Sequence, residues 1–142
     1  MILGNLRQQL CYPNLERSVS DAELNEVLER VNLPGLAERC GGFGAELDFD
    51  KVLSVGERQR LAFARVLLNR PRYVLLDEAT SALDRDNEAA LYQQLVETAT
   101  TFVSVSHHQA LVKYHSRVLE LMTDESWRLY PAAEFHFGDG NA

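Results

Sequence analysis

The stretch LSVGERQRLAFARVLLNRPRYVLLDEATSALD, residues 53–84, decides the fold because it joins a capped helix to a strand that ends in two acids. Ser54 and Glu57 have the spacing of a capping box, which predicts a helix that continues to about Asn69. Gly56 lies in the first turn of this helix, although glycine destabilises helices. We interpret it as a place where a group approaches the backbone closely, and a helix start is where anions bind.

Beyond this stretch, strands continue to alternate with a helix. The runs RYVLLDE at 72–78 and TFVSVSH at 101–107 are largely apolar, which is typical of strands covered on both faces. Asp86 is the expected cap of a helix between them. The expected inward residues of this helix are Ala90, Leu91 and Leu95. With further strands expected at 117–122 and 127–130, the alternation predicts an α/β fold with a parallel sheet and right-handed crossovers.

The first fifty residues predict a small helical unit, because no strand pattern occurs before residue 72. Asn5 is the expected cap of a short helix, and Ser20 with Glu23 forms a second capping box. The helix after this box has one apolar face, made by Leu24, Val27, Leu28 and Val31. The segment 40–50 is rich in glycine and then in acids, which is typical of a loop.

The composition is that of a globular protein of one domain. The chain has 142 residues, of which 46% are hydrophobic, and a formal net charge of -7, which argues against a nucleic-acid partner. Cys11 and Cys40 are far apart in the sequence, as expected for reduced thiols of a cytosolic protein. No apolar run reaches the roughly 20 residues that a membrane helix needs. We therefore expect the chain to serve a membrane only through a partner.

Polar side chains follow the first two expected strands where each strand ends. Asp77 and Glu78 follow one strand, and His107 with His108 follows the other. Ligands of parallel sheets bind at these carboxyl ends. A carboxylate there can hold Mg²⁺ through water, its neighbour can act as a general base, and a histidine can hydrogen-bond a phosphate oxygen. Each of these features alone is common on protein surfaces, so their order carries the interpretation.

That order resembles the nucleotide-binding domain of ATP-binding cassette (ABC) proteins over residues 53–107. Leu53–Glu57 resembles the signature motif, and Tyr73–Glu78 resembles the Walker B motif. Ser81–Asp84 is similar to the D-loop, and His107 is similar to the switch histidine. Four elements in the right sequence and spacing make the resemblance specific.

The resemblance extends to the rest of the chain and implies a domain organisation. Residues 1–52 resemble the helical subdomain that precedes the signature, and residues 53–142 resemble the C-terminal part of the ATPase core. The signature region is most similar to the branch of peroxisomal fatty-acyl transporters and peptide-uptake proteins of the SbmA/YddA type. The implied fold is an incomplete P-loop NTPase domain, with a helical subdomain followed by a partial, mainly parallel sheet and flanking helices.

In this family two nucleotide-binding domains enclose ATP, so the resemblance implies ATP and Mg²⁺ as cofactors and a second such domain as a partner. It also implies a transmembrane domain and a location at the cytoplasmic face of the inner (plasma) membrane. The signature would contact the γ-phosphate of ATP that is bound by the opposite subunit. The residues that would make this contact are Ser54, Val55, Gly56 and Glu57. Val55 stands where the commonest signature has glycine. Related branches of the family also carry an aliphatic residue at this position.

The remaining family roles fall on the strand ends and the D-loop. By the resemblance, Asp77 would hold Mg²⁺ through water, and Glu78 would be the general base on the attacking water. His107 would contact the γ-phosphate, with the adjacent His108 as the alternative. The D-loop residues Ser81 and Asp84 would communicate between the two sites of the dimer.

The chain departs from the family because it has no phosphate-binding loop of the form G-x-x-x-x-G-K-[ST]. Lys51 and Lys113, its only lysines, follow no such glycine run, and the Q-loop glutamine is absent as well. We interpret the chain as a fragment or truncated product that binds ATP poorly and hydrolyses none by itself. The run FVSVS at 102–106 would then expose an unpaired apolar edge, a template for self-association. The tail FGDGNA is expected to fray.

Three functions remain open from the sequence. The leading hypothesis is part of the ATP-hydrolysing domain of an ABC transporter, which couples hydrolysis to transport in the complete protein. A non-catalytic module that lends its signature surface to a complete partner is favoured by the absent phosphate-binding loop. A soluble ABC ATPase of chromosome maintenance or translation is the third, and the lack of long coiled-coil heptads argues against the chromosome type.

Overall fold

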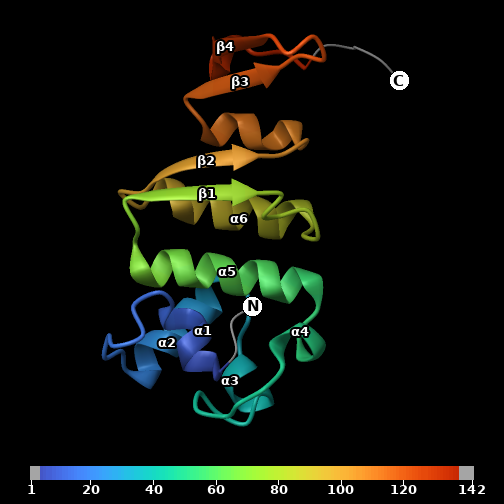
Figure 1. Cartoon of the computed structure of the whole chain (residues 1–142). Coiled ribbons are helices and arrows are strands. Elements are labelled where there is room, and N and C mark those ends of the chain that lie inside the picture. Colours follow the sequence, from blue (N-terminus) through green and yellow to red (C-terminus); the bar gives the residue numbers. More distant parts are fainter. Residues whose placement is uncertain (1–3, 138–142) are drawn as a thin grey trace. The chain divides into compact units, whose positions relative to one another are not determined.

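The computed structural model describes residues 4–137, so most of the tail expected to fray lies outside the described residues (Figure 1). The chain forms two compact units, Met1–Val105 and Ser106–Ala142. The first unit contains the helical segment, the capped helix and both strands of the parallel sheet. No helix in the described part of the chain is long and apolar enough to cross a bilayer.

The N-terminal part of the first unit is helical, as expected. It contains the helices α1 (Leu6–Cys11), α2 (Asp21–Arg30), α3 (Leu36–Arg39) and α4 (Phe49–Val52). The capping of α1 by Asn5 is confirmed, because its side chain accepts a hydrogen bond from the Gln8 amide at 3.0 Å. The segment 40–50 is mostly irregular, but α4 begins inside it.

The capping box predicted at Ser20 forms only in part. The Ser20 hydroxyl accepts a hydrogen bond from the Glu23 amide at 3.2 Å, as expected. The Glu23 carboxylate instead pairs with the Arg17 guanidinium at 3.1 Å. A charged partner attracts the carboxylate more strongly than a neutral backbone amide does, so the reciprocal half of the box is lost.

Helix α5 (Val55–Asn69) packs on both sides, which explains its large apolar surface. In Figure 1 it lies between the cluster α1–α4 and the layer of α6 and the sheet. Its buried residues are Leu61, Phe63, Ala64, Leu67 and Leu68. Polar bonds reinforce the contact with α1: the Arg65 side chain donates to the Gln9 carbonyl at 2.8 Å, and Asn69 donates to the Leu10 carbonyl at 3.1 Å.

The expected βαβ unit is present. Strand β1 (Tyr73–Asp77) pairs in parallel with β2 (Thr101–Val105), and α6 (Arg85–Val96) connects them (Figure 1). Tyr73 is opposite Thr101 and Asp77 is opposite Val105, so both strands end at the same edge of the sheet. This edge is where ligands bind in parallel sheets.

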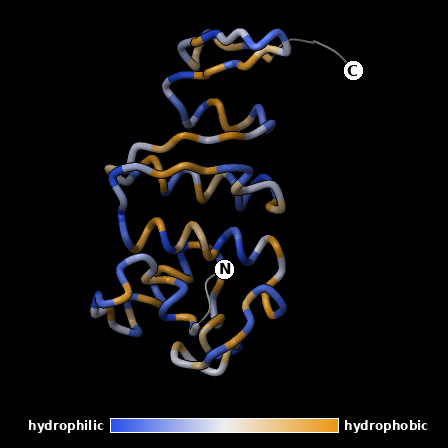
Figure 2. Tube along the Cα trace, viewed as in Figure 1, coloured by the Kyte–Doolittle hydropathy of each residue, from blue (hydrophilic) through white to orange (hydrophobic). Residues whose placement is uncertain are grey.

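The expectation that these strands are covered on both faces is wrong. Leu75 is 70% exposed and Val103 is 58% exposed, whereas the alternate residues Phe102 and Ser104 pack toward α6. The Tyr92 ring of α6 contacts the Phe102 ring edge-to-face, with 6.0 Å between the ring centroids. The Tyr92 hydroxyl donates to the Ser104 hydroxyl at 2.9 Å. In the first unit this two-stranded sheet is covered by α6 on one face, so its apolar second face is exposed. Figure 2 shows that both strands are largely hydrophobic.

Helix α6 begins earlier than expected and turns a different face inward. Its N-cap is Asp84 rather than Asp86. The buried positions of α6 are Glu88, Leu91, Tyr92 and Leu95, which have the i, i+3, i+4, i+7 spacing of one helix face. Leu91 and Leu95 are inward as predicted, but Ala90 is exposed. The buried Glu88 carboxylate accepts a hydrogen bond from the Thr80 hydroxyl at 2.6 Å, which satisfies a group that composition alone would place outside.

The second unit contains an antiparallel hairpin, so the last two strands do not join one parallel sheet. Strands β3 (Arg117–Leu121) and β4 (Trp127–Pro131) pair with each other, and the short helices η1 (Gln109–Tyr114) and η2 (Ala132–Glu134) flank them. Only residues 122–126 separate the two strands. Such a connection is too short for the crossover that parallel strands need.

We predict that the exposed face of β1 and β2 makes the isolated chain self-associate at micromolar concentrations. Leu75→Lys should weaken this association at least tenfold, because the charge would enter an apolar interface, while the melting temperature stays nearly unchanged at so exposed a position. Sedimentation equilibrium measures the association. Leu15→Lys is the matched control, since Leu15 is also half-exposed but lies in the loop before α2. A wild-type chain that stays monomeric throughout would contradict the prediction.

Candidate functional site

The start of α5 forms the predicted capping box. The Glu57 amide donates to the Ser54 hydroxyl at 3.2 Å, and the Ser54 amide donates to the Glu57 carboxylate at 2.8 Å. Ser54 and Val55 are exposed. Among the described residues, no acceptor binds the backbone amides of Val55 and Gly56, which are two of the unpaired donors that a helix start always leaves. These donors and the positive end of the helix dipole face a region accessible to solvent.

Glu57 connects this helix start to the helical segment. Its carboxylate accepts a hydrogen bond from the Arg39 guanidinium at 2.6 Å. Burial acts to raise the pKa of Glu57, but the hydrogen bonds from the Ser54 backbone amide and from Arg39 together hold the pKa below its ordinary value. Glu57 is therefore ionised at neutral pH, and its carboxylate holds the start of α5 through the Ser54 amide and Arg39.

The carboxyl edge of the sheet carries Asp77 and Glu78 at the point where β1 turns. Asp77 is exposed, and Glu78 is half-buried in the left-handed region, with φ of +46°. The Glu78 amide donates to the Val105 carbonyl at 3.0 Å, and the Glu78 carbonyl accepts from the Ser81 amide at 3.2 Å. A residue other than glycine in this region is strained, and such strain is concentrated at functional sites.

The turn after β1, which comprises residues 78–84, packs against the first turn of α5. A Cβ atom added to Gly56 would lie 3.2 Å from the Ala82 carbonyl oxygen and 3.4 Å from the Leu83 side chain. A close approach at Gly56 therefore exists, but the group that approaches is a part of this chain, and the approach of an anion stays a prediction. This contact holds the start of α5 beside the end of β1.

Gln59 is a residue of the site that the sequence analysis missed. It lies one turn beyond Gly56 on the same face of α5 and makes three hydrogen bonds to the turn 78–84. Its amide nitrogen donates to the Glu78 carbonyl at 3.2 Å and to the Ser81 hydroxyl at 2.9 Å. Its amide oxygen accepts from the Ala82 backbone at 3.0 Å. The i, i+3 relation to Gly56 is the pattern that places it there.

Asp84 acts locally as the N-cap of α6. Its carboxylate accepts hydrogen bonds at 2.8 Å from both the backbone amide and the side-chain amide of Asn87. The hydrogen bond from the Asn87 backbone, followed by that from its side chain, lowers the pKa of Asp84. Ser81 lies in the middle of the turn 78–84 and Asp84 lies at its end, and the role of Asp84 between sites stays a prediction.

His107 and His108 belong to the second unit, of which they are the second and third residues. Both are exposed, and the His108 amide donates to the Ser106 hydroxyl at 3.1 Å. The structure thus brings together Ser54–Glu57, Asp77–Glu78 and the turn 78–84 in the first unit. The choice between the two histidines stays open.

The donor groups fit a magnesium nucleotide. In residues 4–137, no three His, Cys, Asp or Glu side chains gather to hold a metal ion. Mg²⁺ usually takes one or two carboxylates and completes its coordination with water and phosphate oxygens, so a single exposed carboxylate such as that of Asp77 suits it. The unpaired amides beside Ser54 suit a phosphate oxygen.

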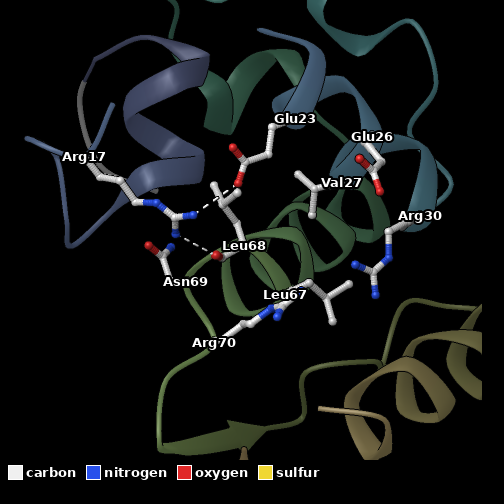
Figure 3. Close-up of a pocket in the computed structure, with 9 residues that line it drawn as sticks. All are labelled: Arg17, Glu23, Glu26, Val27, Arg30, Leu67, Leu68, Asn69 and Arg70. Atoms are coloured by element: carbon white, nitrogen blue, oxygen red, sulfur yellow. Dashed lines mark hydrogen bonds and ion pairs between the residues drawn. The ribbon is translucent and has the colours of Figure 1, made fainter. Parts of the chain in front are cut away.

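The first unit also has a surface pocket of about 410 Å³, whose lining residues are drawn in Figure 3. It is enclosed by α2 and the C-terminal end of α5, where Arg17 donates to the Leu68 carbonyl at 2.8 Å. Because α5 has 15 residues, this end lies about 22 Å from Ser54. The pocket is therefore separate from the candidate site.

We predict that Gly56→Ala lowers the free energy of unfolding by about 1 kcal/mol, although alanine favours helices by about as much. The reason is that the added Cβ meets the Ala82 carbonyl, which the surrounding hydrogen bonds hold in place. Chemical denaturation measures the change. Gly44→Ala is the control, because a Cβ there meets nothing within 4 Å. A Gly56→Ala chain more stable than the wild type would show that the turn yields freely.

We also predict that Glu57→Gln makes stability less sensitive to acid. The folded-state pKa of Glu57 is depressed, so its contribution is present above the unfolded value of about 4.3 and is lost as the pH falls through the folded value. Glutamine keeps the capping-box hydrogen bond but does not titrate. Between about pH 7 and pH 3, the wild type should lose up to about 1 kcal/mol more than the variant. Equal losses, measured by thermal unfolding, would contradict this.

Comparison with known proteins identifies the family. The family model described as "ABC transporter" matches residues 4–81. An uncharacterized ABC transporter ATP-binding protein of Synechocystis sp. is 50% identical over 92% of this chain and 20% of its own length. The ABC transporter D family member 2, chloroplastic, of Arabidopsis thaliana is 38% identical over 91% of this chain and 23% of its own length.

A solved structure agrees. The bacterial Atm1-family ABC exporter with ATP bound has a TM-score of 0.68 and 26% identity, over 84% of this chain and 21% of the exporter chain. The chain thus spans about a fifth of the length of the relatives that it matches. The expected ABC ATPase-like α/β fold and the resemblance to the nucleotide-binding domain are confirmed. The chain belongs to the ABC transporter family.

Proposed function

We propose that this chain forms part of the ATP-hydrolysing domain of an ABC transporter, in which two such domains enclose ATP and couple its hydrolysis to transport. The observation that supports this most directly is the contact between the start of α5 and the turn 78–84. It holds an exposed anion-binding helix end and an acidic strand end in one arrangement. The match to ABC transporters supports ATP as the ligand of that arrangement.

In this proposal the start of α5 serves the opposite domain. Ser54 and the amides of Val55 and Gly56 contact the γ-phosphate of ATP held by the partner domain. Their exposure, together with the absence of a described acceptor for the two amides, supports this role. Glu57 contributes by fixing the helix end through the Ser54 amide and Arg39.

The carboxyl edge of the sheet serves the domain's own nucleotide. Asp77 holds Mg²⁺ through water, and Glu78 accepts the proton of the attacking water as the general base. Ser81 and Asp84 form the D-loop between the two sites, and His107, with His108 as the alternative, contacts the γ-phosphate. Mg²⁺ bound to ATP neutralises charge on the phosphates when it is present.

The assembly also needs groups from outside these residues. No G-x-x-x-x-G-K-[ST] pattern occurs in the 142 residues, so the cradle for the β- and γ-phosphates comes from elsewhere. We propose that residues 1–52 are the helical subdomain and 53–142 the C-terminal part of the ATPase core. The transmembrane domain of the complete transporter holds both at the cytoplasmic face of the membrane.

A second candidate function follows from the same absence. A chain without a phosphate-binding loop can act as a non-catalytic module that presents Ser54 and Gly56 to a complete partner domain. In that case the helix start is used and Glu78 is idle. The two functions therefore differ in whether Glu78 matters.

A chimera in which this chain replaces the matching region of the 50%-identical Synechocystis protein tests the proposal. The purified chimera should hydrolyse ATP. Glu78→Gln should lower hydrolysis at least about 10²-fold, because a general base is lost, and should leave ATP binding intact. Glu26→Gln, on the exposed side of α2, is the charge-matched control and should change nothing.

The rate of phosphate release and the binding of a fluorescent ATP analogue supply the two readouts. A folded chimera that binds ATP and hydrolyses it equally well with Glu78→Gln would contradict the catalytic role. It would support the non-catalytic module only if Ser54→Arg still abolished hydrolysis.

A further inference from the structure

We propose that Gln59 is a positioning residue that couples the signature contact in one nucleotide site to the general base in the other. This inference rests on the proposed function, because it assigns Ser54 to the partner's ATP and Glu78 to the domain's own. Gln59 belongs to none of the four motifs that the family resemblance covers. Its role follows from the contacts of its side chain.

Gln59 uses both ends of its amide on one turn. Its nitrogen donates to the Glu78 carbonyl and the Ser81 hydroxyl, and its oxygen accepts from the Ala82 backbone amide. The side chain is half-buried, and its partners are spread over the strand end and the D-loop. A single rigid amide plane thus connects α5 to both ends of the Glu78–Ala82 turn.

The hydrogen bond to the Glu78 carbonyl matters because of the backbone conformation there. Glu78 has a positive φ, which a residue with a side chain adopts only when its surroundings hold it there. Its carbonyl has two described donors, the Ser81 amide and the Gln59 side chain. Loss of the Gln59 donor would let the Glu78 backbone relax and would redirect its carboxylate.

The same side chain responds to the start of α5. Gln59 lies on the helix face of Gly56, one turn after it, and the Ala82 carbonyl packs so closely on Gly56 that an added Cβ would lie 3.2 Å from its oxygen. A shift of the helix start, when a phosphate binds at Ser54, is therefore transmitted to the turn through two adjacent contacts. The result is that occupation of one site adjusts the base of the other.

Another glutamine of the chain provides a matched comparison. Gln94 of α6 donates to the Arg30 carbonyl at 2.7 Å and accepts from the Arg30 side chain at 3.0 Å. It also connects two elements through a side-chain amide, but it has no contact with the turn 78–84. Replacement of Gln94 therefore reports the effect of losing such a bridge on stability alone.

The experiment measures steady-state ATP hydrolysis of the Synechocystis chimera that carries this whole chain. Gln59→Met removes all three hydrogen bonds at nearly constant volume. Gln59→Glu keeps the acceptor for Ala82 but loses the donor to Glu78. Both should lower kcat by about 10²-fold, the scale expected for a misplaced catalytic group, and leave the KM for ATP within twofold. Gln94→Met should leave kcat unchanged.

Hydrogen exchange on the complete 142-residue chain adds a readout that does not depend on hydrolysis. With Gln59→Met, exchange of the Ala82 amide should accelerate, while amides in the middle of α5 keep their protection. With Gln94→Met, the Ala82 amide should be unaffected.

The results separate this inference from the proposed function. If the wild-type chimera hydrolyses ATP, Glu78→Gln is inactive and Gln59→Met has wild-type kcat, the positioning role is overturned and the proposed function stands. If kcat falls equally for Gln59→Met and Gln94→Met, in proportion to lost stability, the role is also overturned. A chimera whose activity ignores Glu78 would contradict the proposed function itself.

Discussion

The close packing of Gly56 against the Ala82 carbonyl, where an added Cβ would lie 3.2 Å from the oxygen, is the constraint on which the geometry of the candidate site depends. It brings the start of a 15-residue helix against the turn that follows β1, and Gln59 closes the same contact with hydrogen bonds. A Cβ at position 56 would lie 3.2 Å from the Ala82 carbonyl oxygen, so the turn would have to move away slightly to accept it. The helix end and the acidic strand end would then no longer share one geometry.

The sheet shows what a two-stranded βαβ unit can and cannot bury. Helix α6 covers one face, where Tyr92 contacts Phe102 and Ser104 of β2. The opposite face remains apolar and exposed, as at Leu75. A continuously apolar strand is typical of a sheet that is buried on both faces. In the described part of the first unit, only the face toward α6 is buried. The pattern therefore describes a larger sheet than these residues form.

Local signals in the sequence predicted local structure well, and tertiary competition explains the exceptions. The box at Ser54 forms in full because Glu57 can bind the Ser54 amide and Arg39 at once. The box at Ser20 loses its second half because Arg17 draws the Glu23 carboxylate away. Asp84 and Asp86 are equally good caps by residue type, and in the structure Asp84 is the cap, with its carboxylate bound to the Asn87 amides. Strands β3 and β4 form an antiparallel hairpin because only five residues, 122–126, connect them, too few for a parallel crossover.

The same distinction explains the site. Ser54, Gly56 and Glu78 were identified because a motif order marks them, whereas Gln59 has no motif and acts through backbone groups that a sequence does not display. The sequence indicates that a phosphate approaches Gly56, and in the structure the chain's own turn also lies close to the Cα of this residue. The two interpretations are compatible, because the N–H bond of a residue and the direction in which its Cβ would extend from Cα are different. A single glycine can thus present its amide to a ligand and its bare Cα to the turn, which links recognition at the helix end to the position of Glu78.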